Sequence, residues 1–231
     1  MPAFDQKRGG TKNVENVKHV VNNPGAWKAS DIELEQDKDR PYVYVSGFVN
    51  FNTQIYDIRR PSSPVKIFEW TIENPELHRG IGAMDGKYFK INDRYFFAQS
   101  FQFNQGSPDQ DLGAVIFDVT GLPDPARVKE VARIRYGQAP GGFHNMFAYK
   151  HSDGRALLFV TVNSDRALIY DLGKVVAGGD LGLLALEAAL EFLLLVGQAF
   201  ARGLERLARG LVAHADLEPL LVRQFVQELR G

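Results

Sequence analysis

The sequence predicts a mainly β protein, a partial β-propeller of about three four-stranded blades, with an α-helical C-terminal appendage. Three observations support this fold class. An apolar-aromatic-Asp-apolar strand motif occurs three times, a strand rich in aromatic and β-branched residues precedes each copy, and the composition changes abruptly near residue 180. Repetition at such intervals indicates repeated structural units, and the four-stranded antiparallel meander is the unit from which propellers are assembled.

The three motif strands contain aspartates that are 61 and then 53 positions apart (57 to 118, 118 to 171). The copies are Ile55-Tyr56-Asp57-Ile58, Ile116-Phe117-Asp118-Val119 and Ile169-Tyr170-Asp171-Leu172. A residue that recurs at one strand position in every repeat is usually structural. We therefore interpret Asp57, Asp118 and Asp171 as residues that cap the amides of the following turn, not as catalytic acids.

Each blade is expected to contain an inner strand, an aromatic strand, the Asp strand and, after a proline-bearing turn, an outer strand. This order places the blades at about 26–72, 81–136 and 143–172. The third blade lacks the proline turn and the outer strand after Asp171. Residues 16–21 alternate like an outer strand without a blade, so they are either the tail of a lost blade or a clasp that completes the third one.

Three segments follow from the composition: a disordered N-terminus (1–12), the partial propeller (13–180) and a helical hairpin (181–231). The last segment is rich in Leu, Ala and Arg and has no Ile, Ser, Thr or Asn. This composition predicts helices at about 181–212 and 216–229. Glu187, Glu191 and Gln198 interrupt the apolar stretch, so we expect it to pack against the sheets or a second chain instead of spanning a membrane.

Charge and cysteine content exclude several classes of partner and site. The 231 residues include 27 basic and 28 acidic side chains, a net charge of −1, which gives no long-range field to attract nucleic acid. The absence of cysteine excludes disulfides, thiolate metal sites and cysteine nucleophiles. The first ten residues have no apolar h-region, so we expect a cytoplasmic chain unless a signal peptide has been lost.

The repeats resemble the LVIVD-repeat family of bacterial β-propellers from residue 13 to about 180. The resemblance rests on Ile-Tyr-Asp-Ile followed by Pro-Ser-Ser-Pro-Val, on Phe-Asp-Val-Thr-Gly-Leu-Pro-Asp-Pro, and on Leu-Phe-Val-Thr-Val-Asn followed by Ile-Tyr-Asp-Leu. It implies an exported and longer parent with more blades, and it says little about activity. In this chain, Leu/Ala/Arg-rich helix replaces the outer strand of the third blade, either as a genuine fusion or as the product of a shifted reading frame.

Two histidines precede inner strands and are expected near the mouth of the propeller channel, a common site of ligand binding. His78 and His144 are candidate ligands for copper or zinc. Arg79 and Lys28 are expected beside them, where they would suit a small anion. The selenium-binding proteins that act as methanethiol oxidases, a distantly similar propeller group, use histidines with copper. The alternative is that each imidazole hydrogen-bonds the backbone of a neighbouring blade.

These observations favour a binding scaffold for a protein or small-molecule ligand over an enzyme. The alternative function is a metal-dependent oxidoreductase with His78 and His144 among the ligands. Known rings need about four or more blades, so three blades cannot close, and we expect self-association to cover the open ends.

Overall fold

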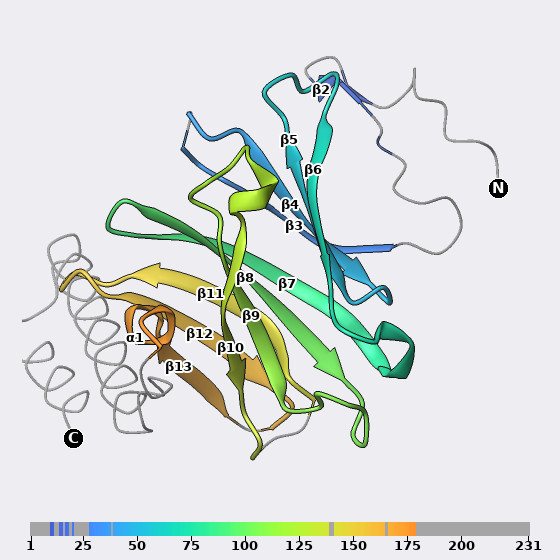
Figure 1. Ribbon diagram of the computed structural model, residues 1–231, viewed down its shortest axis with the longest axis vertical. Helices are drawn as coiled ribbons and strands as arrows, with labels where there is room; N and C mark the ends of the chain where they lie inside the picture. The colour runs from blue at the N-terminus through green and yellow to red at the C-terminus, as the bar shows by residue number, and fades with distance from the viewer. Residues whose placement is uncertain are drawn as a thin grey trace, which may run out of the picture. The chain divides into compact units, whose positions relative to one another are not determined.

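Three groups of antiparallel strands form the described part of the protein (Figure 1). The computed structural model describes residues 10–11, 14–15, 17–18, 20, 28–37, 39–138, 141–164 and 166–178. All of them belong to the first of two units of the chain, Met1–Leu183. The helices expected over 181–231 lie outside the described residues.

Each of the first two strand groups is a four-stranded antiparallel meander. The first meander consists of β3 (Lys28–Leu34), β4 (Tyr42–Phe48), β5 (Asn52–Asp57) and β6 (Val65–Thr71). The second meander consists of β7 (Gly80–Ile91), β8 (Arg94–Phe103), β9 (Leu112–Asp118) and β10 (Lys129–Arg135). In both meanders the strands pair in the order of the chain, as short connections between antiparallel neighbours favour.

The third meander has three strands, β11 (Phe143–Lys150), β12 (Ala156–Val162) and β13 (Ala167–Asp171). It continues directly into the five-residue helix α1 (Leu172–Val176), with Asp171 as its N-cap. Short 3-10 helices, η1 (Pro75–Leu77) and η2 (Pro125–Arg127), lie before β7 and β10. The prediction of a mainly β protein is confirmed within the described residues.

The repeated aspartates end the third strand of each meander and cap the backbone that follows. Oδ1 of Asp57 accepts a hydrogen bond from the Arg59 amide (2.8 Å), and Oδ1 of Asp118 accepts one from the Thr120 amide (2.9 Å). Oδ1 of Asp171 accepts a hydrogen bond from the Lys174 amide (3.3 Å). A short carboxylate side chain satisfies amides two or three residues ahead, which explains why the same residue type ends three strands.

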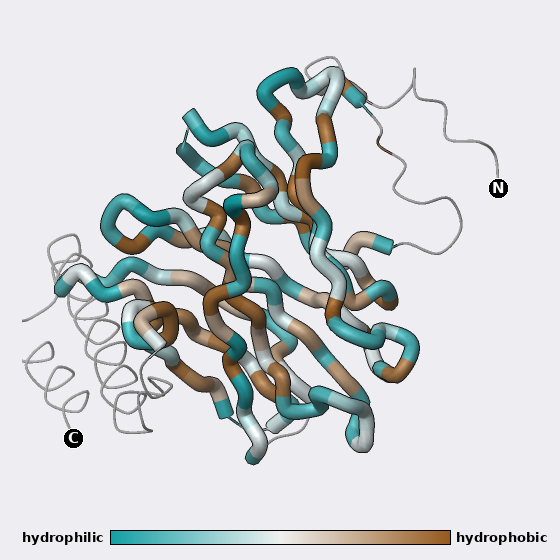
Figure 2. Tube along the Cα trace, viewed as in Figure 1, coloured by the Kyte–Doolittle hydropathy of each residue, from teal (hydrophilic) through white to brown (hydrophobic). Residues whose placement is uncertain are grey.

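The second meander is buried on both faces because its strands alternate between two apolar clusters. On β8, Phe97 and Phe101 pack with residues of the first meander, whereas Phe96 and Ala98 pack with residues of the third. Alternation along a strand sends successive side chains to opposite faces, so a strand buried on both sides has a continuous apolar sequence. Figure 2 shows brown, apolar segments along the strands and teal, polar residues at many of the turns.

A single residue pair, Phe48 with Gly82, joins the first two meanders into one eight-stranded sheet. Gly82 has a φ of 93°, and a Cβ atom there would lie 3.1 Å from the backbone nitrogen of Val49. A glycine therefore permits both the left-handed backbone conformation and the close approach of the two strands.

The N-terminal residues differ from the expectation. Residues 10–11, expected to be disordered, form β1 (Gly10–Thr11), which pairs with β2 (Val14–Glu15). Residues 17, 18 and 20, from the stretch expected to be an outer strand, are not in a strand. Among the described residues, no helix has the length and apolar character needed to cross a membrane.

Candidate functional site

The four candidate site residues occupy separate positions at the starts of the inner strands. Lys28 is the exposed first residue of β3, and His78 and Arg79 directly precede β7. His144 is the exposed second residue of β11. Within the described part of the chain, no hydrogen bond or ion pair joins any two of these four residues. The expected basic channel mouth is therefore not built from direct contacts among them.

His78 is a buried, fully engaged side chain. Its Nδ1 lies 3.0 Å from the carbonyl oxygen of Asn74, and its Nε2 lies 3.1 Å from Oδ2 of Asp109. The imidazole also packs against the rings of Phe51 and Phe103. These contacts tie the segment before β7 to the loop between β8 and β9, and an acidic neighbour replaces the basic surroundings expected at this position.

A metal does not fit these histidines. Both ring nitrogens of His78 face oxygen acceptors, so a metal would have to displace Asn74 or Asp109 from the ring. Nδ1 of His144 lies 2.9 Å from Oε1 of Gln102, a side chain that is not a usual copper or zinc ligand. In addition, no group of three or more His, Asp or Glu side chains among the described residues is placed to hold a metal ion.

The loop between β8 and β9 also carries two carboxylates, Asp109 and Asp111, that form ion pairs with Arg135. Oδ1 of Asp109 accepts a hydrogen bond from the Arg135 guanidinium at 2.5 Å, and the same guanidinium reaches Asp111 at 2.7 Å. Arg135 and His78 together lower the pKa of the Asp109 carboxyl, although its partial burial acts in the opposite direction. This arrangement stabilises a loop and leaves Asp109 a poor proton acceptor.

The inner strands carry a polar network that connects successive meanders. Oδ2 of Asp31 on β3 accepts a hydrogen bond from the Gly86 amide on β7 (3.0 Å). Oδ2 of Asp85 on β7 accepts one from the Met146 amide on β11 (2.5 Å). All three inner strands have a β-bulge near these residues, at Ala29/Asp31, Ala83/Gly86 and Phe143/Met146. A bulge interrupts the regular hydrogen bonding between two paired strands and changes the direction of the nearby backbone groups. A backbone amide at the bulge can then bond a carboxylate of the neighbouring meander.

Lys87 partly neutralises this network. Its ammonium donates to Asp85 and lies 3.8 Å from Oδ2 of Asp31. Burial nevertheless raises the pKa of the Asp85 carboxyl, because desolvation of the charged form outweighs the opposing effect of Lys87. Burial also raises the pKa of Glu33, whose Oε1 accepts a hydrogen bond from the Tyr88 amide at 3.3 Å.

Replacing Glu33 with glutamine is expected to stabilise the protein more at about pH 7 than at about pH 4. The folded state holds the Glu33 proton to a higher pH than the unfolded state does, so the contribution of Glu33 to stability falls as the pH rises above its ordinary pKa of 4.5. Glutamine stays neutral throughout and keeps the acceptor oxygen. Urea unfolding at both pH values measures the difference. An equal effect of the substitution at both would contradict the expectation.

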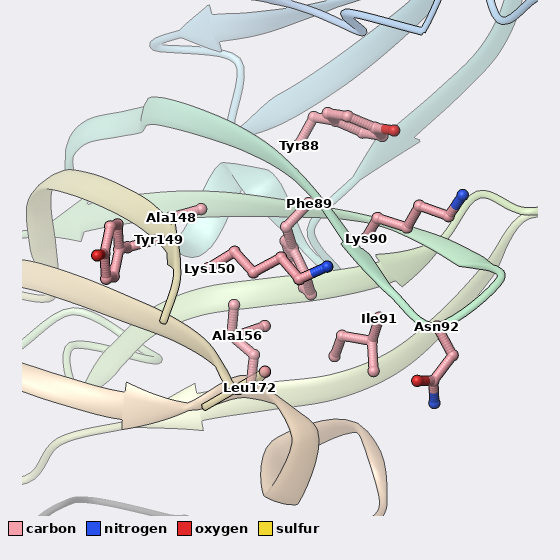
Figure 3. Close-up of a pocket in the computed structure, with 11 residues that line it drawn as sticks. Tyr88, Phe89, Lys90, Ile91, Asn92, Ala148, Tyr149, Lys150, Ala156 and Leu172 are labelled. Atoms are coloured by element: carbon pink, nitrogen blue, oxygen red, sulfur yellow. The ribbon is translucent and has the colours of Figure 1, made fainter. Parts of the chain in front are cut away.

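A separate pocket of about 640 Å³ lies between the ends of β7 and β11, near the start of α1 (Figure 3). Its apolar lining comes from all three elements and from β12: Phe89, Ile91, Ala148, Ala156 and Leu172. Asn92 in the β7–β8 turn and Gly154 in the β11–β12 turn also line it. The pocket has a size typical of small-molecule sites, and none of its described lining residues is acidic.

The two lysines among the described lining residues, Lys90 and Lys150, point in different directions. Lys90 belongs with Tyr88 on the opposite face of β7 from Phe89, and its ammonium contacts the Tyr95 hydroxyl at 3.3 Å. Lys150 lies on the same face of β11 as Ala148, which packs toward the second meander. Figure 3 shows Lys150 extending toward Phe89, with Tyr88 and Lys90 directed away from it. Lys150 is therefore the cation that belongs to the pocket.

Sequence reasoning missed the pocket and the inner-strand carboxylates. One signal for the carboxylates was available: Asp31, Glu33 and Glu35 alternate along the sequence, which places Asp31 and Glu33 on one face of β3, with Glu35 directly after the strand. The pocket had no comparable signal, because the two turns that border it are more than 50 positions apart in the sequence, at Asn92 and Gly154.

Comparisons with known proteins identify no family. No protein-family model matches the chain, and no curated protein matches it. Among solved structures it is similar to a protein from Bifidobacterium bifidum s17 that is provisionally named an exo-beta-1,3-galactanase, with 12% sequence identity and a TM-score of 0.41. The match covers 66% of this chain and 50% of that one, so this chain spans about half of that protein's length. A similarity this low does not bear on function.

Proposed function

We propose that the chain is a non-catalytic binding scaffold, a partial β-propeller of the LVIVD-repeat kind, whose open ends are covered by meanders of a second copy. The order of strands supports the proposal, since each meander runs from an inner strand to a third strand that ends in aspartate. The inner-strand hydrogen bonds support it as well, because Asp31 and Asp85 each bond the amide of the next inner strand.

The exposure of apolar side chains on the two outer meanders is the observation that carries the proposal. Asp31 and Glu33 bond toward the second meander, so the alternate residues of β3, Ile32 and Leu34, face away from it. Ile32 is 63% exposed. On β11, Met146 and Ala148 pack toward the second meander, so Phe147, which is 62% exposed, faces outward.

The second meander, in contrast, has a neighbouring meander packed on each of its faces. Exposed large apolar side chains on a sheet face favour association, because burying them stabilises the complex by about 25 cal/mol per Å². The face of β11 in one copy and the face of β3 in another would pack as the adjacent meanders do within one chain. Such a contact is head-to-tail, so it builds rings or longer assemblies.

Replacing Ile32 or Phe147 with glutamate is expected to convert the assembly of the wild-type protein into monomers. A charge on either face would have to be desolvated in the complex, and this costs more than burying the original side chain gains. Light scattering after size-exclusion chromatography measures the mass.

The control is Leu77→Glu, which places the same charge at a 57% exposed leucine of η1, away from both strands. This variant should associate like the wild-type protein. A wild-type protein that is a monodisperse monomer, or an assembly that persists in both the Ile32 and the Phe147 variants, would overturn the proposal.

A further inference from the structure

We infer that the pocket between β7, β11 and α1 is a binding site for a small amphipathic monocarboxylate, with a flat apolar body and one carboxylate that pairs with Lys150. This inference does not depend on assembly of the meanders. Three features of the pocket support it: the apolar side chains of its lining, its charge balance and the position of one ammonium group.

The apolar lining selects a ligand with an apolar body. Phe89 and Leu172 are buried side chains of the lining, and Ala148 and Ala156 contribute only methyl groups. These small side chains leave room for a ligand, and the ring of Phe89 adds an aromatic group to the lining. A pocket of about 640 Å³ accommodates a bicyclic aromatic body.

The charges of the side chains that line the pocket favour a ligand with a single negative charge. Lys150 supplies one ammonium group, and the lining residues that the structure describes include no acid that would neutralise it. Within the described residues, Lys150 has no hydrogen-bond or ion-pair partner, whereas Lys90 is occupied by Tyr95 on the other face of β7. A dianion such as phosphate would leave one charge unpaired against an apolar wall, which is costly. A carboxylate matches the one available cation.

The position of Lys150 directs the ligand. It is the last residue of β11 and pairs in register with Ala156 on β12, so its backbone is held by the hairpin. The side chain extends toward Phe89, as Figure 3 shows. The carboxylate would therefore lie beside Lys150, and the apolar body would contact the neighbouring apolar side chains of the lining.

The test compares 1-naphthaleneacetate with its neutral isostere, 1-naphthaleneacetamide, by isothermal titration calorimetry. We expect the carboxylate to bind about tenfold more tightly than the amide, since a charge-assisted hydrogen bond contributes about 1.5 kcal/mol or more. Lys150→Met keeps the length of the side chain and removes its charge, and should weaken carboxylate binding about tenfold. Amide binding should change little.

Two further variants make the result specific. Lys129→Met removes an exposed charge on β10, outside the pocket, and should bind like the wild-type protein. Ala156→Phe fills the pocket and should abolish binding of both compounds. Equal affinity for the two compounds, unchanged affinity in Lys150→Met, or no binding of the carboxylate up to about millimolar concentration would each overturn the inference. Light scattering on the same samples tests the assembly separately.

Discussion

Replacing Arg40 with alanine is expected to lower the free energy of unfolding by about 3–5 kcal/mol, because it leaves the buried Glu35 carboxylate without its cation. The Arg40 guanidinium binds both oxygens of Glu35, at 2.6 and 3.1 Å, and Glu35 also accepts a hydrogen bond from the Tyr44 hydroxyl. Both members of the ion pair are buried. Burial raises the pKa of Glu35 despite these partners.

The same guanidinium also connects two meanders. Its Nη2 atom donates to the carbonyl oxygen of Val119 at 2.9 Å, just after β9, and its Cζ atom lies 3.9 Å from the centroid of the Tyr95 ring. Arg40 itself belongs to the turn between β3 and β4. Its removal therefore breaks the ion pair with Glu35 inside the first meander. It also breaks a hydrogen bond and a cation–π contact to the second meander.

Chemical unfolding at neutral pH measures the effect. The control is Arg59→Ala, which removes an ion pair with Asp57 in which the arginine side chain is 62% exposed, and should change stability by less than about 1 kcal/mol. The double variant Glu35→Gln/Arg40→Met leaves no uncompensated charge and should lose less than Arg40→Ala does. A loss of under about 1 kcal/mol for Arg40→Ala would contradict the importance assigned to this buried pair.

Replacing Gly142 with alanine is expected to destabilise the protein by roughly 2–6 kcal/mol, the combined range for overpacking and backbone strain. Gly142 has a φ of 68° and lies at the entry to β11. A Cβ atom there would lie 2.0 Å from the carbonyl oxygen of Phe101 and 2.6 Å from that of Leu112. Both oxygens belong to strands of the second meander, so neither can move without disturbing its sheet.

Two other glycine variants distinguish steric overlap from backbone strain as the cause of the lost stability. Gly137→Ala meets nothing within 4 Å and has no positive φ, so it should be nearly neutral. Gly154→Ala also meets nothing within 4 Å but has a φ of 92°, so it should cost only about 1–2 kcal/mol of backbone strain. Thermal unfolding ranks the three. If Gly142→Ala unfolded with the same midpoint as Gly154→Ala, the close contact with Phe101 would not matter.

The strand pattern could be predicted because it is local. The run of aromatic and β-branched residues before Asp57, Asp118 and Asp171 specifies extended backbone, and a carboxylate at each strand end caps amides two or three positions ahead. The sequence likewise indicated that no outer strand follows Asp171, where the structure has α1.

The role of His78 could not be predicted in the same way. Its position before an inner strand suggested a metal-binding residue at the mouth of the propeller channel. Its partner Asp109, however, lies 31 positions away in a loop, and no sequence pattern relates the two residues. Lys150 presented the opposite problem, since a lysine beside a hairpin turn has no feature that distinguishes it from any solvated lysine.

The repeated strands, the capping aspartates and the mainly β character could be read from the amino-acid sequence, because they depend on residues close together along the backbone. The hydrogen bonds from the next inner strand to Asp31 and Asp85, across 55 and 61 positions, and the place of Lys150 beside a pocket became clear only from the folded structure. A carboxylate or an ammonium group can pair with many different polar groups equally well, so its partner cannot be deduced from its own position in the sequence. The partner is the polar group that the neighbouring meander places beside it in the folded chain.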